Sequence, residues 1–278
     1  MTFRNSPLAC LGMEAEERRA YADAIRRTIV EQSYRANVGH IGSALSIADL
    51  VAAVFATARL EGDGERDRVV LSKGHAALAL YAALHLQGRL NEGVIETYCA
   101  DGTLLGVHPE HGLEGVDFCT GSLGQGLSLG AGAALAAKRH GSDRQVFVIL
   151  SDAELNEGST WEAVMFVAQH DLDNLVLLVD LNGQQALGHT PEVLHLGDVG
   201  EKLSAFGWAV DGVPGHDQEA LGTALGRPGE GRPRALVAET TFGYGVSFME
   251  SKIEWHYLPL DDEANAKALA ELEERAGT

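Results

Sequence analysis

The chain has 278 residues, of which 45% are apolar, so it is long and apolar enough to form a globular fold with a real core. It carries 21 Lys and Arg residues against 40 Asp and Glu residues, which gives a formal net charge of −19 at pH 7. An acidic protein of this kind is not expected to bind nucleic acid or anionic membranes non-specifically. It can still hold a phosphorylated small molecule, because one metal ion and a few backbone N–H groups can bind a diphosphate.

Neither a membrane span nor a secretion signal is expected. The chain has no run of about eighteen apolar residues, the length that a membrane-spanning helix needs. Its N-terminus lacks a basic stretch followed by an apolar one. The cysteines, Cys10, Cys99 and Cys119, lack metal-ligand spacing and are typical of a reducing compartment. We therefore expect a cytoplasmic protein.

The N-terminal part of the chain has two helical patterns. A helix is predicted from Glu14 to Arg35, because apolar side chains recur on one stripe and charged ones lie elsewhere. The stripe consists of Tyr21, Ile25, Ile29 and Gln32. A second, apolar helix is predicted from Ser46 to Ala58, and Ser46 with Asp49 matches a variant of the capping box that starts helices.

From residue 69 onwards, strand and helix patterns alternate. In chain order we predict strand 69–71, helix 76–87, a loop over 100–120, helix 124–139, strand 146–150, helix 159–170, strand 175–180, a loop over 183–196, helix 199–206, strand 208–211, helix 217–225 and strand 235–240. This alternation predicts an α/β fold with a mostly parallel sheet and helices on both of its faces.

The chain is predicted to form a single domain over residues 1–278. The Gly- and Pro-rich segment 226–233 is interpreted as a surface turn rather than a linker, because only one more strand follows it. The acidic segment 261–278 is predicted to form a solvated C-terminal helix or tail.

Oxygen-bearing side chains follow two neighbouring predicted strands. The segment S-D-A-E-L-N-E-G, Ser151–Gly158, comes after strand 146–150, and D-L-N-G, Asp180–Gly183, ends the next strand. If these strands are parallel neighbours, Asp152 and Asn182 lie at the same edge of the sheet, where open α/β sheets bind ligands. Carboxylate and amide oxygens are ligands that a hard cation prefers. Each residue alone is more often a helix N-cap or a turn residue, so their combination is what predicts a cation site.

A glycine-rich segment, T-G-S-L-G-Q-G at Thr120–Gly126, opens the helix predicted from residue 124. Glycine lets the backbone approach a ligand closely, and the start of a helix offers N–H groups that have no partner within the helix. Taken alone, the segment is equally compatible with a tight turn and with a cofactor-binding loop.

Four histidines lie in loops or at strand ends rather than inside predicted helices. They are His40, His75, His108 and His256. A single histidine in such a place is more often structural or simply exposed. A set of four fits a polar site that binds hydroxyl groups and moves protons near neutral pH.

Together these segments resemble the N-terminal, diphosphate-binding half of transketolase, from about residue 20 to residue 260. Ser151–Gly158 is similar to the G-D-G-x-x-x-E-G segment of that family, and Asn182 to the Asn that closes its thiamine-diphosphate motif. The segments L-S-K-G-H-A, G-x-H-P-E and T-G-S-L-G-Q-G occur in the family's order, and T-F-G-Y-G follows them with His256 beyond it.

The resemblance implies a role for each of these residues. Asp152, Asn182 and the backbone carbonyl of Gln184 would bind Mg²⁺ or Ca²⁺, which would clamp the diphosphate of thiamine diphosphate. The implied cofactor-binding residues are His75, Gly121, Ser122, Leu123, Ser151, Asp152, Ala153, Glu154 and Asn182. The implied catalytic residues are His40, His108 and His256, which would contact sugar hydroxyls or the diphosphate and help to move protons, and Glu157, which would link to an acid of the partner across an interface.

The resemblance also implies a partner. Full-length transketolases continue with domains that bind the aminopyrimidine ring and supply an activating glutamate, and no residue of this chain matches that glutamate. We therefore expect an N-terminal subunit of a split transketolase, active only with a second subunit that carries the pyrimidine-binding and C-terminal domains, in a two-plus-two heterotetramer. Its substrates would be small sugars, because the family moves a two-carbon ketol unit from a ketose to an aldehyde.

Three residues depart from the family pattern. Ser151 and Ala153 replace two glycines, and Tyr257 follows His256 where the family commonly has a small residue. A side chain at residue 153 would be strained if its φ angle had to be positive. The ring of Tyr257 would narrow the substrate channel or contact an unusual acceptor.

Two alternatives stay open at this point. A thiamine-dependent subunit of a 2-oxo acid dehydrogenase would share the metal motif, although the histidine set favours transketolase. A non-catalytic partner subunit that has lost cofactor binding would explain Ser151 and Ala153.

Overall fold

A computed structural model of the chain describes residues 10–61 and 65–277, and a five-stranded sheet forms its centre. The strands are β1 (Arg68–Leu71), β2 (Val146–Ser151), β3 (Leu175–Leu181), β6 (Ala209–Pro214) and β7 (Arg234–Glu239). Their order is β1-β2-β3-β7-β6, and each neighbouring pair is parallel. The predicted parallel sheet is therefore confirmed, with strand ends shifted by a few residues at most.

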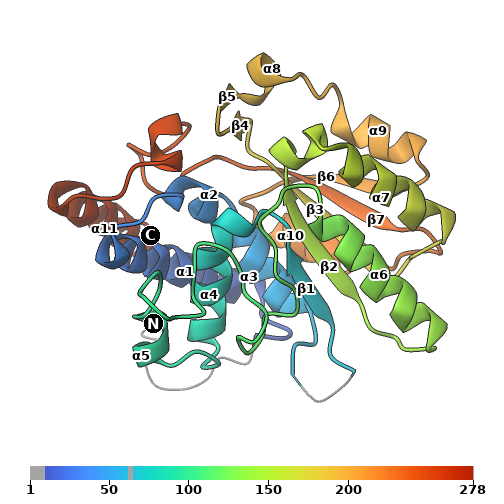
Figure 1. The fold of residues 1–278 in the computed structure, drawn as a ribbon, viewed down its shortest axis with the longest axis horizontal. Helices are drawn as coiled ribbons and strands as arrows, with labels where there is room; N and C mark the ends of the chain where they lie inside the picture. Colours follow the sequence, from blue (N-terminus) through green and yellow to red (C-terminus); the bar gives the residue numbers. More distant parts are fainter. Residues whose placement is uncertain (1–9, 62–64, 278) are drawn as a thin grey trace.

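Helices cover both faces of this sheet, as predicted (Figure 1). Successive side chains of a strand point to opposite faces, so Val148 and Leu177 pack on one side while Phe147 and Val176 pack on the other. The first side is covered by α6 (Gly126–Arg139), α7 (Gly158–Gln169) and α9 (Val199–Ala205). The second is covered by α1 (Ala15–Ala36), α3 (Ala48–Thr57), α4 (Ala77–Leu86) and α10 (Gln218–Leu225), with α11 (Asp262–Ala276) packed against α1. Continuous apolar strands are needed because both faces are buried.

The stripe predicted on the first helix is buried, since Tyr21, Ile25, Ile29 and Gln32 all lie in the interior. The predicted helix 46–58 is present as α3, and a separate helix that the sequence patterns did not predict, α2 (Ile41–Ser46), ends just before it, with Ile47 between the two. The capping box predicted there is wrong, because Ser46 ends α2 and its hydroxyl donates to Asp180, while Asp49 forms a buried ion pair with Arg26. These long-range partners outweigh the local cap.

The C-terminal helix is present as α11, but it is only partly solvated. Ala268 and Leu272 lie on its inner face and are buried against the body of the protein. The predicted loop 100–120 has no helix or strand longer than an isolated bridge, His111 with Leu113. Within the predicted loop 183–196 the structure adds the short hairpin β4 (Gln184–Gln185) and β5 (Gly188–His189), then α8 (Thr190–Val193). Other elements that the sequence patterns did not predict are α5 (Glu92–Ile95), η1 (Gly74–Ala76), η2 (Asp152–Asn156) and η3 (Ile253–His256).

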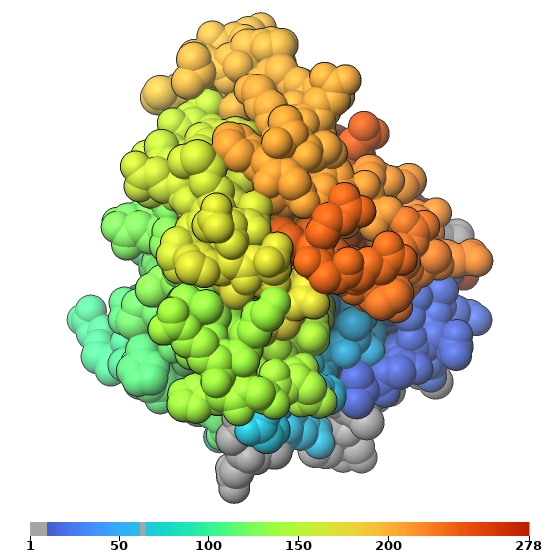
Figure 2. All heavy atoms as spheres, turned by 90° about the vertical axis from the view of Figure 1, so that its right-hand side faces the viewer, coloured from blue at the N-terminus to red at the C-terminus, as the bar shows by residue number. Residues whose placement is uncertain are grey.

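Two views locate the hairpin segment relative to the sheet. In Figure 1, β4, β5 and α8 lie beyond the carboxyl ends of the central strands. Figure 2 looks onto the side that carries α6, α7 and α9, and there the same segment stands at the upper edge of the molecule. None of the helices within residues 10–61 and 65–277 combines the length and the apolar character that crossing a membrane requires.

Small residues let α6 pack closely on the sheet. A Cβ atom added at Gly130 would lie 2.5 Å from Cγ2 of Val148, so no larger residue fits there without a shift of the helix. Gly132 on the same helix is exposed, and a Cβ atom added there would meet nothing within 4 Å. One helix therefore offers two glycines for comparison, one where an added methyl group is crowded and one where it is not.

We predict opposite effects on stability for alanine at these two positions. Gly130→Ala should lower the free energy of unfolding by about 1–3 kcal/mol, because the methyl group overfills a packed contact. Gly132→Ala should raise it by up to about 1 kcal/mol, because alanine favours a helix over glycine. Urea unfolding followed by circular dichroism measures both, and equal effects of the two substitutions would contradict this packing.

Candidate functional site

The candidate site lies at the carboxyl ends of the central strands. Ser151 pairs with Asp180 in the parallel register of β2 and β3, so Asp152 and Asn182 emerge next to each other. Gly183 links them, since its backbone N–H donates to Oδ2 of Asp152 over 3.0 Å. The juxtaposition predicted from the two sequence segments is therefore present in the fold.

Asp152 is fully buried and its carboxylate accepts three hydrogen bonds. Besides the bond from Gly183, Oδ2 accepts the hydroxyl of Thr190 over 2.7 Å, and Oδ1 accepts the backbone N–H of Ala153 over 2.9 Å. Burial raises the pKa of Asp152 to about 6, although the bond from Thr190 opposes that shift. Thr190 was not identified from the sequence, because only the fold of the hairpin and α8 brings it here.

The amide group of Asn182 has a defined orientation. Its Oδ1 accepts the backbone N–H of Gln184 over 2.9 Å, and its Nδ2 donates to Oδ2 of Asp180 over 2.8 Å. Within residues 10–61 and 65–277, no group of three or more His, Cys, Asp and Glu side chains is arranged to hold a metal ion. A cation at Asp152 would therefore depend on amide and backbone oxygens, as the sequence resemblance implies for Asn182 and Gln184.

A cavity of about 250 Å³ opens beside these residues. Predicted residues in its wall are His40, His75, His108, Gly121, Leu123, Ser151, Ala153, Asn182, Gln184 and His256. Residues in the wall that the sequence patterns missed are Ser43, Lys73, Gln185, Ala186 and Phe242. Four predicted residues lie outside the wall: Ser122, Asp152, Glu154 and Glu157. The parallel sheet brings part of the predicted set together, because His75, Ala153 and Asn182 follow the ends of β1, β2 and β3.

Three of the histidines form a cluster. The ring centroids of His40, His75 and His256 lie 5.2–5.6 Å from one another. Burial, reinforced by neighbouring positive groups, lowers the pKa of His75 well below its usual value and that of His256 to about 4. Burial also lowers the pKa of His40. The rings are therefore neutral near pH 7, and each can donate one hydrogen bond and accept another.

The fourth histidine lies against the glycine-rich segment. A Cβ atom added at Gly121 would lie 3.0 Å from Cδ2 of His108, and one added at Gly74 would lie 2.8 Å from the backbone nitrogen of Gly121. Glycine at both positions therefore lets these loops approach each other and His108. Ser43 also contacts the histidine cluster, since its hydroxyl lies 2.8 Å from Nε2 of His75.

Glu154 organises the loops instead of facing the cavity. Its buried carboxylate accepts the backbone N–H groups of Gly124 over 3.0 Å and Ser151 over 3.1 Å, together with the hydroxyl of Ser72. One side chain thus joins the ends of β1 and β2 to the glycine-rich segment. Its predicted contact with a cofactor stays a prediction, but in this arrangement the carboxylate acts through the backbone that it holds.

The departures from the family pattern cause no backbone strain. Ser151 has φ −94° and ψ 161°, an extended conformation that any residue adopts, and Ala153 is not among the residues with positive φ. Tyr257 is exposed, and its hydroxyl donates to the backbone carbonyl of Ala186 in the β4–β5 turn. The tyrosine therefore ties the hairpin to the segment that carries His256.

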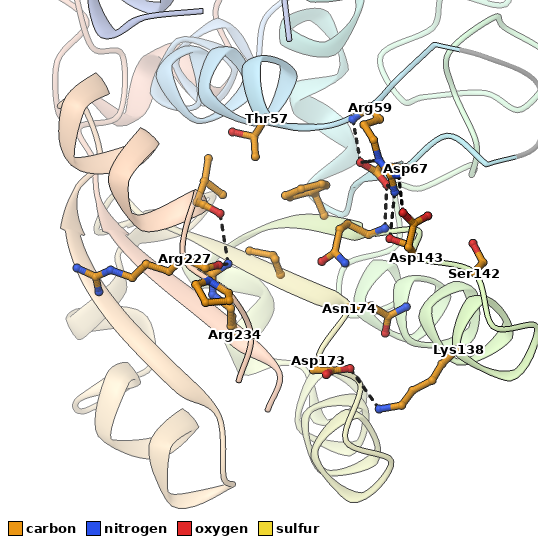
Figure 3. Close-up of a pocket in the computed structure, with 16 residues that line it drawn as sticks. Thr57, Arg59, Asp67, Lys138, Ser142, Asp143, Asp173, Asn174, Arg227 and Arg234 are labelled. Carbon is orange, nitrogen blue, oxygen red and sulfur yellow. Dashed lines mark hydrogen bonds and ion pairs between the residues drawn. The ribbon is translucent and has the colours of Figure 1, made fainter. Parts of the chain in front are cut away.

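A larger hollow of about 590 Å³ lies at the opposite, amino end of the strands (Figure 3). Its charged side chains already have partners within the protein. Arg59 pairs with Asp67 and Asp143, and Lys138 pairs with Asp173. Arg234 donates to backbone carbonyls at the end of α10. Because these groups are already paired, the smaller cavity with its histidines is the better candidate site.

Comparisons with known proteins agree with this geometry. The family model described as transketolase, thiamine diphosphate binding domain, matches residues 17–274, and the chain belongs to this family. It is 38% identical over 260 residues to a 6-deoxy-6-sulfo-D-fructose transketolase subunit of a Clostridium species, a match that covers 91% of this chain and 94% of that subunit. It is 36% identical over 270 residues to one of the apulose-4-phosphate transketolase subunits of Phocaeicola vulgatus, covering 95% of this chain and 96% of that one.

Larger transketolases match over only part of their length. Human transketolase is 37% identical over 246 residues, which span 86% of this chain but 39% of the human protein. The crystal structure of transketolase from Campylobacter jejuni superposes with a TM-score of 0.86 at 30% identity, covering 94% of this chain and 43% of that one. The resemblance inferred from the sequence motifs is thereby confirmed, and so is the α/β fold that it implied.

The neutral state of the histidine cluster can be tested directly. We predict that His256 takes up a proton only near pH 4 and stays neutral from about pH 5.5 upward, because burial disfavours the imidazolium ion. NMR titration of the ring C–H signals, assigned with a His256→Gln variant, measures this pKa. A midpoint near 6.5, the ordinary value for histidine, would show that the ring is not desolvated.

Proposed function

We propose that this chain is the diphosphate-binding subunit of a two-component transketolase that moves a two-carbon ketol unit from a ketose to an aldehyde. One observation carries the proposal: Asp152 and Asn182 lie side by side at the edge of a cavity whose wall contains four histidines. Two relatives named as transketolase subunits match this chain over almost their whole length, which supports a division of the enzyme between two polypeptides.

The residues present fit a cofactor with a metal-bound diphosphate. Nδ1 of His40, Oε1 of Gln184 and Nε2 of Gln185 are buried in the cavity wall without a hydrogen-bond partner among the described residues. Buried polar atoms of this kind are normally paired, so they call for a polar ligand. The carboxylate of Asp152 is likewise desolvated, and a cation would compensate its charge.

In this proposal Asp152, Asn182 and the backbone carbonyl of Gln184 hold Mg²⁺ or Ca²⁺, which in turn holds the diphosphate of thiamine diphosphate. When bound, the cofactor supplies the nucleophilic carbon of the reaction. The protein orients the cofactor through His75 and the backbone of Gly121 and Leu123, all of which line the cavity. Ala153 contributes the close backbone approach that glycine has in the family pattern.

The remaining histidines are suited to the sugar. His40, His108 and His256 line the same cavity, and an imidazole ring can donate to one hydroxyl through one nitrogen and accept from another through the second. Such rings orient a polyol and relay protons without adding a fixed charge. Small sugars are therefore the proposed substrates.

The partner subunit would complete the site. Glu157 is exposed at the start of α7, where it is free to meet an acid of the partner as the sequence resemblance implies. A two-plus-two heterotetramer and a cytoplasmic location belong to this proposal as well. The 2-oxo acid dehydrogenase alternative is not favoured by the relatives, and a non-catalytic subunit loses its main support because Ser151 and Ala153 are unstrained.

The proposal predicts activity only in the assembled enzyme. The purified chain, saturated with thiamine diphosphate and Mg²⁺, should show no ketol transfer, and the mixture with the pyrimidine-binding subunit should be active. A coupled assay of ketose consumption with an aldehyde acceptor measures this, and a 2-oxo acid with an artificial electron acceptor serves as the control for the alternative reaction. Turnover by the chain alone would refute the split arrangement.

The metal site predicts a specific loss. Asp152→Ala should abolish metal-dependent cofactor retention, because it removes the carboxylate of the proposed ligand set. Calorimetric titration of thiamine diphosphate into the assembled complex, with and without Mg²⁺, measures the effect. Glu219→Ala removes an exposed carboxylate from α10 and serves as the matched control. Unchanged affinity in Asp152→Ala would show that the metal assignment is wrong.

A further inference from the structure

A buried ion pair contacts the candidate metal site, because one of its two members accepts a hydrogen bond from Asn182. Lys73 follows β1 and Asp180 lies near the end of β3, and both side chains are completely buried. Their charged groups are in hydrogen-bond contact. Burial of two charges is expensive unless each is fully paired, so such a pair needs a reason to be present.

Asp180 has no capacity left to bind a cation. Its Oδ1 accepts the hydroxyls of Ser46, over 2.7 Å, and Thr240. Its Oδ2 accepts the ammonium group of Lys73 and, over 2.8 Å, the Nδ2 group of Asn182. Four donors occupy the lone-pair positions of one carboxylate, so its negative charge is satisfied within the protein.

The same contacts decide which way the amide of Asn182 points. An ionised carboxylate can only accept hydrogen bonds, so it selects the NH₂ group of Asn182 and repels the amide oxygen. With Nδ2 turned to Asp180, Oδ1 is the end of the amide that faces Gln184, whose backbone carbonyl is the proposed third ligand. A reversed amide would present NH₂ groups, which cannot bind a cation.

We propose that Asp180, with its charge balanced by Lys73, is a positioning residue that fixes the amide oxygen of Asn182 toward the cation. This inference rests on the proposed function and deepens it. The role of Lys73 is to compensate charge, because without its ammonium group Asp180 would be a second uncompensated carboxylate beside Asp152. Groups that orient metal ligands in this way commonly change metal affinity about 10- to 100-fold.

An isosteric double substitution tests the inference. In the Lys73→Met, Asp180→Asn variant, the amide oxygen introduced at residue 180 would keep the hydroxyls of Ser46 and Thr240, so its NH₂ group would face Asn182. The amide of Asn182 should then reverse and present NH₂ to the cation. We expect the Mg²⁺ concentration that gives half-maximal binding of thiamine diphosphate to rise about 10- to 100-fold.

Adding Asn182→Asp to the double variant distinguishes a positioning role of Asp180 from a general structural role. A carboxylate at residue 182 has two equivalent oxygens, so in the double variant one can accept from the amide introduced at residue 180 while the other faces the cation. The triple variant should therefore recover most of the lost Mg²⁺ affinity. In the wild-type background the same Asn182→Asp change should weaken Mg²⁺ binding, because two carboxylates would face each other. If the double variant lost Mg²⁺ affinity only through structural damage, Asn182→Asp would not raise the affinity in that background while lowering it in the wild type.

The measurement is calorimetric titration of thiamine diphosphate into the two-subunit complex over a range of Mg²⁺ concentrations, with circular dichroism as the check on folding. If wild-type binding does not depend on Mg²⁺, the proposed metal site itself fails. If wild-type binding depends on Mg²⁺ but the double variant is unchanged, or the triple variant is no better than the double one, the positioning role is overturned. Should the double variant not fold, tighter or unchanged Mg²⁺ binding by Asn182→Asp alone would overturn it equally.

Discussion

The site depends on the parallel register of β2 and β3. Ser151 pairs with Asp180, and this pairing sends Asp152 and Asn182 out of the same edge with Gly183 between them. A shift by one residue would turn every side chain of a strand to the other face, so the buried apolar faces on both sides hold this register. The hydrophobic core therefore fixes the relative positions of two polar groups that contribute nothing to it.

Polar groups in this region are buried at a cost and then paired with one another. The carboxylate of Glu154 accepts from three segments of the chain, and that of Asp180 accepts from four donors that include Lys73. Asp152 differs, because its hydrogen bonds leave its pKa raised to about 6, and in the proposed function a cation would supply the missing charge. With that cation bound, the three carboxylates would all be compensated locally, and a chain with a formal charge of −19 could accept an anionic cofactor there.

Sequence patterns predicted the parts of this arrangement that follow from local order. The buried strands have continuous branched apolar runs, and Asp152 and Asn182 stand directly after two of them. Thr190, Ser43 and Lys73 could not be assigned in this way, because their contacts join segments far apart in the chain. The same limit explains the wrong capping box, where Ser46 found a distant carboxylate instead of its own helix. The C-terminal helix was predicted to be solvated because its overall composition is acidic. Its buried face consists of Ala268 and Leu272, and the overall composition does not reveal so small an apolar stripe.

The central claim is that this chain binds one half of thiamine diphosphate and that a partner binds the other. A crystal structure of the two-subunit complex grown with thiamine diphosphate and Mn²⁺, with the metal located by its anomalous signal, tests it most directly. The account predicts a metal peak coordinated by Asp152, Oδ1 of Asn182 and the carbonyl of Gln184, with the diphosphate beside it and the pyrimidine ring in the partner subunit. A metal bound elsewhere, or a cofactor enclosed entirely by this chain, would contradict it.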